Sequence, residues 1–80
     1  MGKIVMELFV HEKDVTTIYK KLQELLPAYR WDKISIGYCG WVNAPDCWWV
    51  RFPVKNSVRR ELIEWIDTQG FDIYNPELIY

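Results

Sequence analysis

The hydrophobic pattern of this chain switches between two periods, and the switch limits the folds that the chain can adopt. Apolar side chains occupy every second position over residues 3–11, which is the pattern of a half-buried strand. From Val15 they recur at steps of three and four residues, which indicates an amphipathic helix. Pro27 lacks an N–H and disfavours helical geometry at Leu26, so we expect the helix to end there.

A hairpin is predicted next. Residues 33–41 alternate again, and after a turn-like segment the stretch DCWWVRF at 46–52 supplies the returning strand. A register that places Trp41 opposite Trp49 keeps paired side chains on the same face of the sheet. Because proline offers no donor to a neighbouring strand, Pro53 predicts that the returning strand ends or bulges just before it.

A second helix and a short last strand complete the pattern. The helix begins near Asn56 and ends at Gly70, and residues 71–74 form the last strand before a tail at 75–80. Two strand-helix-strand units in this order are typical of the α+β ferredoxin-like sandwich, βαββαβ. We therefore predict a four-stranded antiparallel sheet with two helices on one face, formed by residues 1–80 as a single domain.

Charge and cysteine content narrow the class of protein. Ten basic and eleven acidic residues give a net charge of −1, with no long run of either sign. Non-specific binding to a phosphate backbone needs a basic face, so the composition disfavours that class. The chain has two cysteines, no apolar run as long as a membrane span and no signal-peptide pattern. We therefore expect a cytoplasmic protein that does not associate with membranes.

The paired tryptophans of DCWWVRF are expected to have different environments. Neighbouring strand residues point to opposite faces, so Trp48 is predicted to lie under the helices and Trp49 on the open face of the sheet. The same parity places aromatic residues from the other strands on that open face. The predicted binding residues are Phe9, Trp41, Trp49, Arg51 and Tyr74.

An exposed aromatic surface of this size is rare on a soluble monomer unless it is covered or used. The tail residues 78–80 fold back over part of it in one hypothesis. In a second, a protein partner or a second copy of the chain covers it, since Trp, Tyr and Arg dominate interface hot spots. We expect this second case: a small non-enzymatic interaction module that acts as a regulator or inhibitor by binding through the aromatic outer face.

A third hypothesis is single-stranded RNA stacked on the rings. "LFV" at residues 8–10 is similar to the start of the first-strand signature of the RNA recognition motif, and "WVRF" at 49–52 resembles the end of its third-strand signature. The resemblance implies stacking on Phe9 and Trp49. It is confined to these two segments, and Asp46 stands where that family has glycine.

Catalytic and metal-binding chemistry is not predicted. His11 is the only histidine, and neither it nor the cysteines, Cys39 and Cys47, belong to a nucleophile or chelating motif. With Trp41 opposite Trp49, the two cysteines lie several residues apart along the sheet, which disfavours a disulfide. We expect no enzyme activity, no metal and no cofactor.

Overall fold

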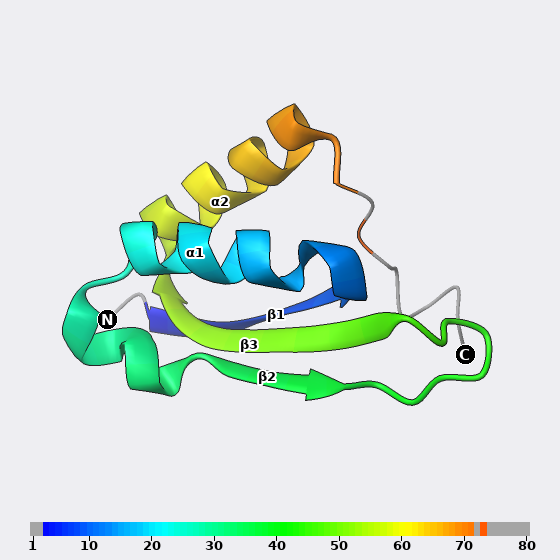
Figure 1. Cartoon of the computed structure of the whole chain (residues 1–80). Helices are drawn as coiled ribbons and strands as arrows, with labels where there is room; N and C mark the ends of the chain where they lie inside the picture. Colours follow the sequence, from blue (N-terminus) through cyan, green and yellow to red (C-terminus); the bar gives the residue numbers. More distant parts are fainter. Residues whose placement is uncertain (1–2, 72, 74–80) are drawn as a thin grey trace.

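The computed structural model describes residues 3–71 and 73, in which helices pack on one side of an antiparallel sheet in an α+β arrangement (Figure 1). Within these residues no helix has the length and apolar character needed to cross a membrane. The regular elements, in chain order, are β1 (Lys3–His11), the 3₁₀ turn η1 (Glu12–Asp14), α1 (Val15–Leu25), the 3₁₀ segment η2 (Ala28–Lys33), β2 (Ser35–Tyr38), β3 (Cys47–Lys55) and α2 (Asn56–Gln69).

The sheet has the order β1-β3-β2, and both pairings are antiparallel. β3 pairs with β1 over nine consecutive residues, from Lys3 opposite Lys55 to His11 opposite Cys47, without a bulge. Both helices lie on the same side of the sheet (Figure 1). The other side carries no helix in the described part of the chain.

The core lies between the sheet and the helices, and the alternation of each strand determines which residues enter it. Even-numbered side chains of β1 and β3 point toward the helices, so Val50, Phe52 and Val54 are fully buried. The helices contribute side chains from their apolar stripes, as the three- and four-residue spacing predicts. The buried core residues are Leu8, Val10, Ile18, Leu22, Leu26, Val50, Phe52, Val54, Leu62 and Ile66.

The predicted four-stranded ferredoxin-like sandwich is wrong, because in the described residues the sheet has three strands. Gly70 ends α2 in the left-handed conformation, with φ at 72°, as its position in the sequence predicted. Of the expected strand at 71–74, Phe71 is not in a strand and Ile73 makes an isolated antiparallel bridge to Val10. One bridge does not make a ladder of paired residues. Residues 72 and 74, like the tail at 75–80, lie outside the described residues.

The hairpin register also differs from the prediction. Gly37, not Trp41, lies opposite Trp49, so the register is displaced by four residues. The loop between the strands is correspondingly longer. Gly40 turns the chain with φ at 71°, and a tight turn follows in which the Ala44 N–H donates to the Trp41 carbonyl at 3.2 Å. A displacement of four residues preserves parity, so the side chains stay on their predicted faces.

Pro53 does not end β3, which continues to Lys55. The Cys39 N–H donates to the Cys47 carbonyl, so odd-numbered backbone groups of β3 point toward β2. Continuing the register past Ser35 would pair Lys33 with Pro53 at such a hydrogen-bonded position, where proline has no N–H. β2 therefore begins only at Ser35, and the expected start at residue 33 is wrong because η2 occupies residues 28–33.

Candidate interaction face

The open side of the sheet carries the odd-numbered side chains of β1 and β3, and Trp49 lies at its centre. Its indole packs directly over Gly37 of β2. A Cβ atom added to Gly37 would lie 2.2 Å from Cζ2 of the Trp49 ring, so only glycine admits the ring here. The Arg51 guanidinium lies 5.1 Å from the centre of the same ring, within range of a cation–π interaction.

Arg51 is held in place by an ion pair across the β1–β3 ladder. Its Nη2 lies 2.6 Å and its Nε 3.1 Å from the same carboxylate oxygen of Glu7. The Arg51 side chain is 53% exposed and the Glu7 side chain 34%, so solvent screens the ion pair and the pair adds little to stability. Its effect is positional, because it fixes the cation above the Trp49 ring.

A second pair of rings continues the surface. Phe9 is the direct cross-strand neighbour of Trp49, and its ring centre lies 4.9 Å from that of Trp41. Trp41 reaches this face from the loop after β2 rather than from the strand. Val5, on the same face of β1, is 68% exposed. We call Val5, Phe9, Trp41, Trp49 and Arg51 the aromatic face.

Beyond Phe9, the face ends in a polar cluster at the β2–β3 loop. Nδ1 of His11 lies 2.6 Å from a carboxylate oxygen of Asp46, and the Glu12 N–H donates to the Asp46 carbonyl at 2.8 Å. These contacts tie the end of β1 to the loop. No group of three or more His, Cys, Asp or Glu residues in the described segments can hold a metal ion.

Cys39 and Cys47 are neighbours in this cluster, contrary to the prediction that they lie apart. Their sulfur atoms are 3.2 Å apart, because the four-residue displacement of the register places them opposite each other. Burial, followed by the hydrogen bond to Cys39, raises the pKa of the Cys47 thiol to about 12. A thiol with so high a pKa is protonated at neutral pH and is a poor nucleophile, which disfavours Cys47 as a catalytic residue.

Comparisons with protein-family models, curated proteins and solved structures find no match to this chain.

Four of the five predicted binding residues lie together, and the fifth cannot be placed. Phe9, Trp41, Trp49 and Arg51 form one continuous surface, whereas Tyr74 lies outside the described residues. Gly37, on which the Trp49 ring packs, was not among the predicted site residues. A lone glycine within an alternating strand is the signal that indicates a close approach of this kind.

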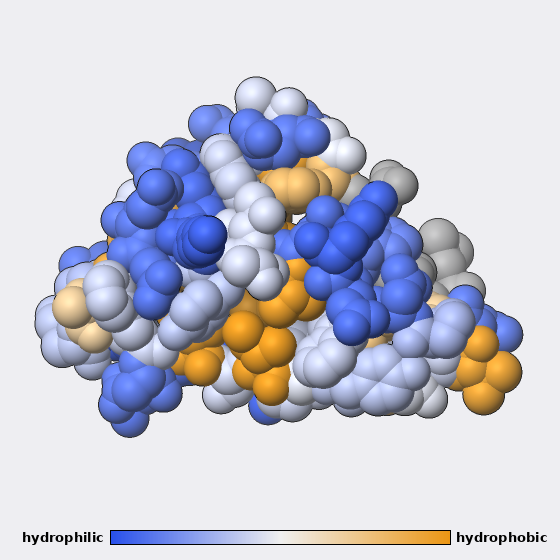
Figure 2. Space-filling view, in the orientation of Figure 1, coloured by the Kyte–Doolittle hydropathy of each residue, from blue (hydrophilic) through white to orange (hydrophobic). Residues whose placement is uncertain are grey.

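Trp48 lies on the helix side of the sheet, as parity predicted, but it is only half-buried. Its ring meets Tyr38 edge to face at 5.5 Å, and no described residue forms a hydrogen bond with its Nε1. The helices do not cover β2, so Ile36 of that strand stays 37% exposed. Figure 2 shows apolar surface gathered at the start of β2, below α1.

Proposed function

We propose that the chain is a protein-interaction module that regulates or inhibits a partner by covering part of that partner's surface with the aromatic face. The observation that carries the proposal is the arrangement of rings on a sheet surface that neither helix covers. The rings of Trp49, Phe9 and Trp41 lie side by side in that order across this surface, and the Arg51 guanidinium lies above the Trp49 ring. Tryptophan and arginine are among the residue types that supply most of the energy at protein interfaces.

Preorganisation supports this function. The Trp49 ring is seated on Gly37 and held from above by Arg51, and Phe9 is packed on Trp41. Side chains fixed before binding lose little rotational entropy when a partner arrives, and each flexible side chain would otherwise cost about 0.5–1.5 kcal/mol. The rings therefore offer a rigid apolar contact area at low entropic cost.

Electrostatics favour a protein over a nucleic acid as the partner. Arg51 is already paired with Glu7, and Asp46 adds a second carboxylate beside His11 at the end of the face. Glu7 thus compensates the charge of Arg51, whereas binding to a phosphate backbone depends on the release of counterions by uncompensated basic residues. Protein interfaces, in contrast, accommodate paired charges at their rims.

The test uses the purified chain in two ways: as bait to capture a partner, and alone in solution to measure self-association. The double variant Trp49→Ala with Phe9→Ala should remain folded by circular dichroism and should lose any partner, or any self-association measured by sedimentation, that the wild type shows. Ile63→Ala, a change at a 40% exposed residue of α2, serves as the matched control and should retain both. Retention by the double variant, or binding abolished by nuclease treatment, would refute the proposal.

A further inference from the structure

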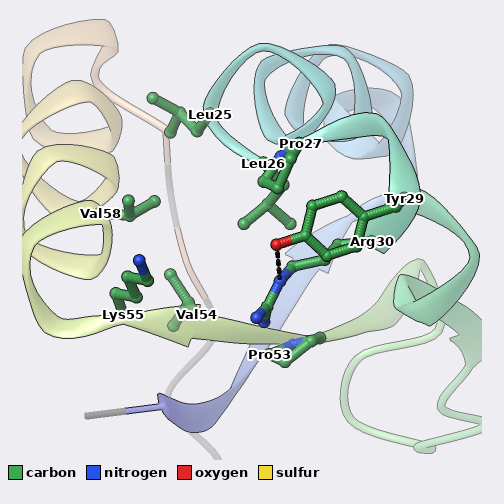
Figure 3. Close-up of a pocket in the computed structure, with 9 residues that line it drawn as sticks. All are labelled: Leu25, Leu26, Pro27, Tyr29, Arg30, Pro53, Val54, Lys55 and Val58. Carbon is green, nitrogen blue, oxygen red and sulfur yellow. Dashed lines mark hydrogen bonds between the residues drawn. The ribbon is translucent and has the colours of Figure 1, made fainter. Parts of the chain in front are cut away.

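A pocket of about 190 Å³ lies at the edge of the sheet, where β3 extends beyond β2 (Figure 3). Its walls come from the end of α1 and the residues after it, from η2, from the end of β3 and from the first turn of α2. None of them belongs to the aromatic face. The lining residues are Leu25, Leu26, Pro27, Tyr29, Arg30, Pro53, Val54, Lys55 and Val58.

Two cations enter this pocket. In Figure 3 the Arg30 guanidinium extends from η2 toward β3 beside Pro53, and the Lys55 ammonium rises toward Val58. None of the described residues that line the pocket is acidic. In the described part of the chain neither cation lies within ion-pair distance of a carboxylate.

The charge of Arg30 is therefore only partly compensated. Its side chain is half-buried, and its Nε donates to the Tyr29 hydroxyl at 3.5 Å. The guanidinium also lies 5.5 Å from the centre of the Tyr29 ring. A partly desolvated guanidinium gains most from an anion that accepts two of its N–H groups, as a carboxylate does.

The start of α2 adds to the positive potential. The helix begins at Asn56, and the residue at its N-cap position, Lys55, makes no side-chain capping hydrogen bond to the first N–H groups. Val58, in this first turn, lines the pocket. The positive end of the helix dipole thus lies on the same side as Lys55.

Apart from the Tyr29 hydroxyl, the other lining side chains are apolar, so the complementary ligand has a hydrocarbon body. Leu25, Leu26, Val54 and Val58 supply aliphatic surface, and burial of apolar ligand surface against it favours binding. The volume is below the ~300–1,000 Å³ of pockets for drug-sized ligands, so the ligand is small. We propose that this pocket binds a small organic carboxylate with an aliphatic or aryl body, its carboxylate on Arg30 and Lys55 and its body against the leucines and valines.

Hexanoate is the probe, with hexanamide as the neutral match and acetate as the anion without a body. Titration of ¹⁵N-labelled protein at constant ionic strength should give saturable amide shifts at Leu26, Arg30, Lys55 and Val58. Hexanamide and acetate should each bind about tenfold more weakly, which corresponds to ~1.4 kcal/mol. Equal affinity for hexanamide, or hexanoate shifts centred elsewhere, would overturn the proposal.

Variants test the two cations separately. Arg30→Gln and Lys55→Gln should each weaken hexanoate binding by about tenfold. Lys13→Gln makes the same charge change at an exposed residue of η1 and should leave the affinity unchanged. The amide shifts of β1 report whether each variant is folded, and because Lys55 is exposed its variant tests the site even if Arg30→Gln unfolds. Unchanged affinity in a folded Lys55→Gln variant would overturn the proposal.

Discussion

Replacing Gly37 with alanine tests the seat of the Trp49 ring directly. The new Cβ would lie 2.2, 2.4 and 2.8 Å from three ring atoms, whereas Cβ contacts under 3.0 Å are essentially never observed. The ring must therefore move by about 0.8 Å or more, and overpacking of this kind costs about 1–3 kcal/mol. Movement away from Arg51 also forfeits the cation–π interaction, at about 0.5–1 kcal/mol.

The backbone works in the opposite direction. Gly37 is not among the residues with positive φ, so alanine fits its conformation and gains about 0.4–1 kcal/mol from the reduced entropy of the unfolded chain. Summed with the clash, Gly37→Ala should lower the free energy of unfolding by about 1–3 kcal/mol. For a domain of this size each kcal/mol corresponds to about 4–8 °C in Tm.

The assay is a double-mutant cycle, with urea unfolding followed by far-UV circular dichroism. Once Trp49→Ala has removed the ring, the clash disappears, so Gly37→Ala should stabilise the protein by about 0.4–1 kcal/mol. The sign of the effect thus reverses between the two backgrounds, and the coupling energy should exceed about 1.5 kcal/mol. A Gly37→Ala cost that is the same with and without the ring would refute the packing of Trp49 over β2.

Three further predictions concern Trp48 and the cysteine pair. Trp48→Ala should lower the free energy of unfolding by about 3 kcal/mol in urea denaturation, since its ring packs against the core; a loss below about 1 kcal/mol would contradict this. Because the pKa of Cys47 is raised from 9.0 to about 12, the unfolded chain loses this proton above about pH 9 while the folded chain keeps it. Stability should therefore fall more steeply between pH 9 and 12 than in Cys47→Ala, and equal slopes in pH-dependent urea titrations would count against it. Diamide, an azo oxidant that takes up the two thiol hydrogens, should join Cys39 to Cys47 within one chain, because 3.2 Å separates the sulfurs; peptide mapping that finds only intermolecular disulfides would disprove the pairing.

The faces of the strands were predictable from the sequence because they depend on parity alone. Trp48 and Trp49 lie on opposite sides of β3, and Phe9 joins Trp49 on the open side, as the alternation indicates. The helices were equally predictable from the sequence, since Pro27 and Gly70 mark where they end. These features follow from interactions between residues close in the sequence.

The register of β2 was not predictable, because it depends on the conformation of a whole loop. The loop is longer than predicted because three features fix its conformation. These are the left-handed Gly40, the turn from Trp41 to Ala44, and the hydrogen bond that the Tyr38 hydroxyl donates to the Pro45 carbonyl. The proximity of the Cys39 and Cys47 thiols follows from that register, so it was predicted wrongly as well. The fourth strand was predicted wrongly for a related reason: apolar Phe71 and Ile73 alternate with Asp72 in the sequence, but the pairing of Ile73 depends on distant β1, where among the described residues Val10 alone bridges it.

Pro53 connects the limits of the sheet with the proposed carboxylate pocket. Proline is disfavoured in a central strand because it lacks an N–H, yet β3 continues past Pro53. The position of the missing N–H faces β2 and not β1, so the β1–β3 ladder is intact. The absence of that donor stops β2 at Ser35, so the chain before it forms η2 instead of extending the ladder. Arg30 then lies over an edge of β3 that is not paired with any strand in the described part of the chain, which creates the pocket. Pro53 therefore accounts for the unpaired edge of β3 at which the pocket with Arg30 and Lys55 forms.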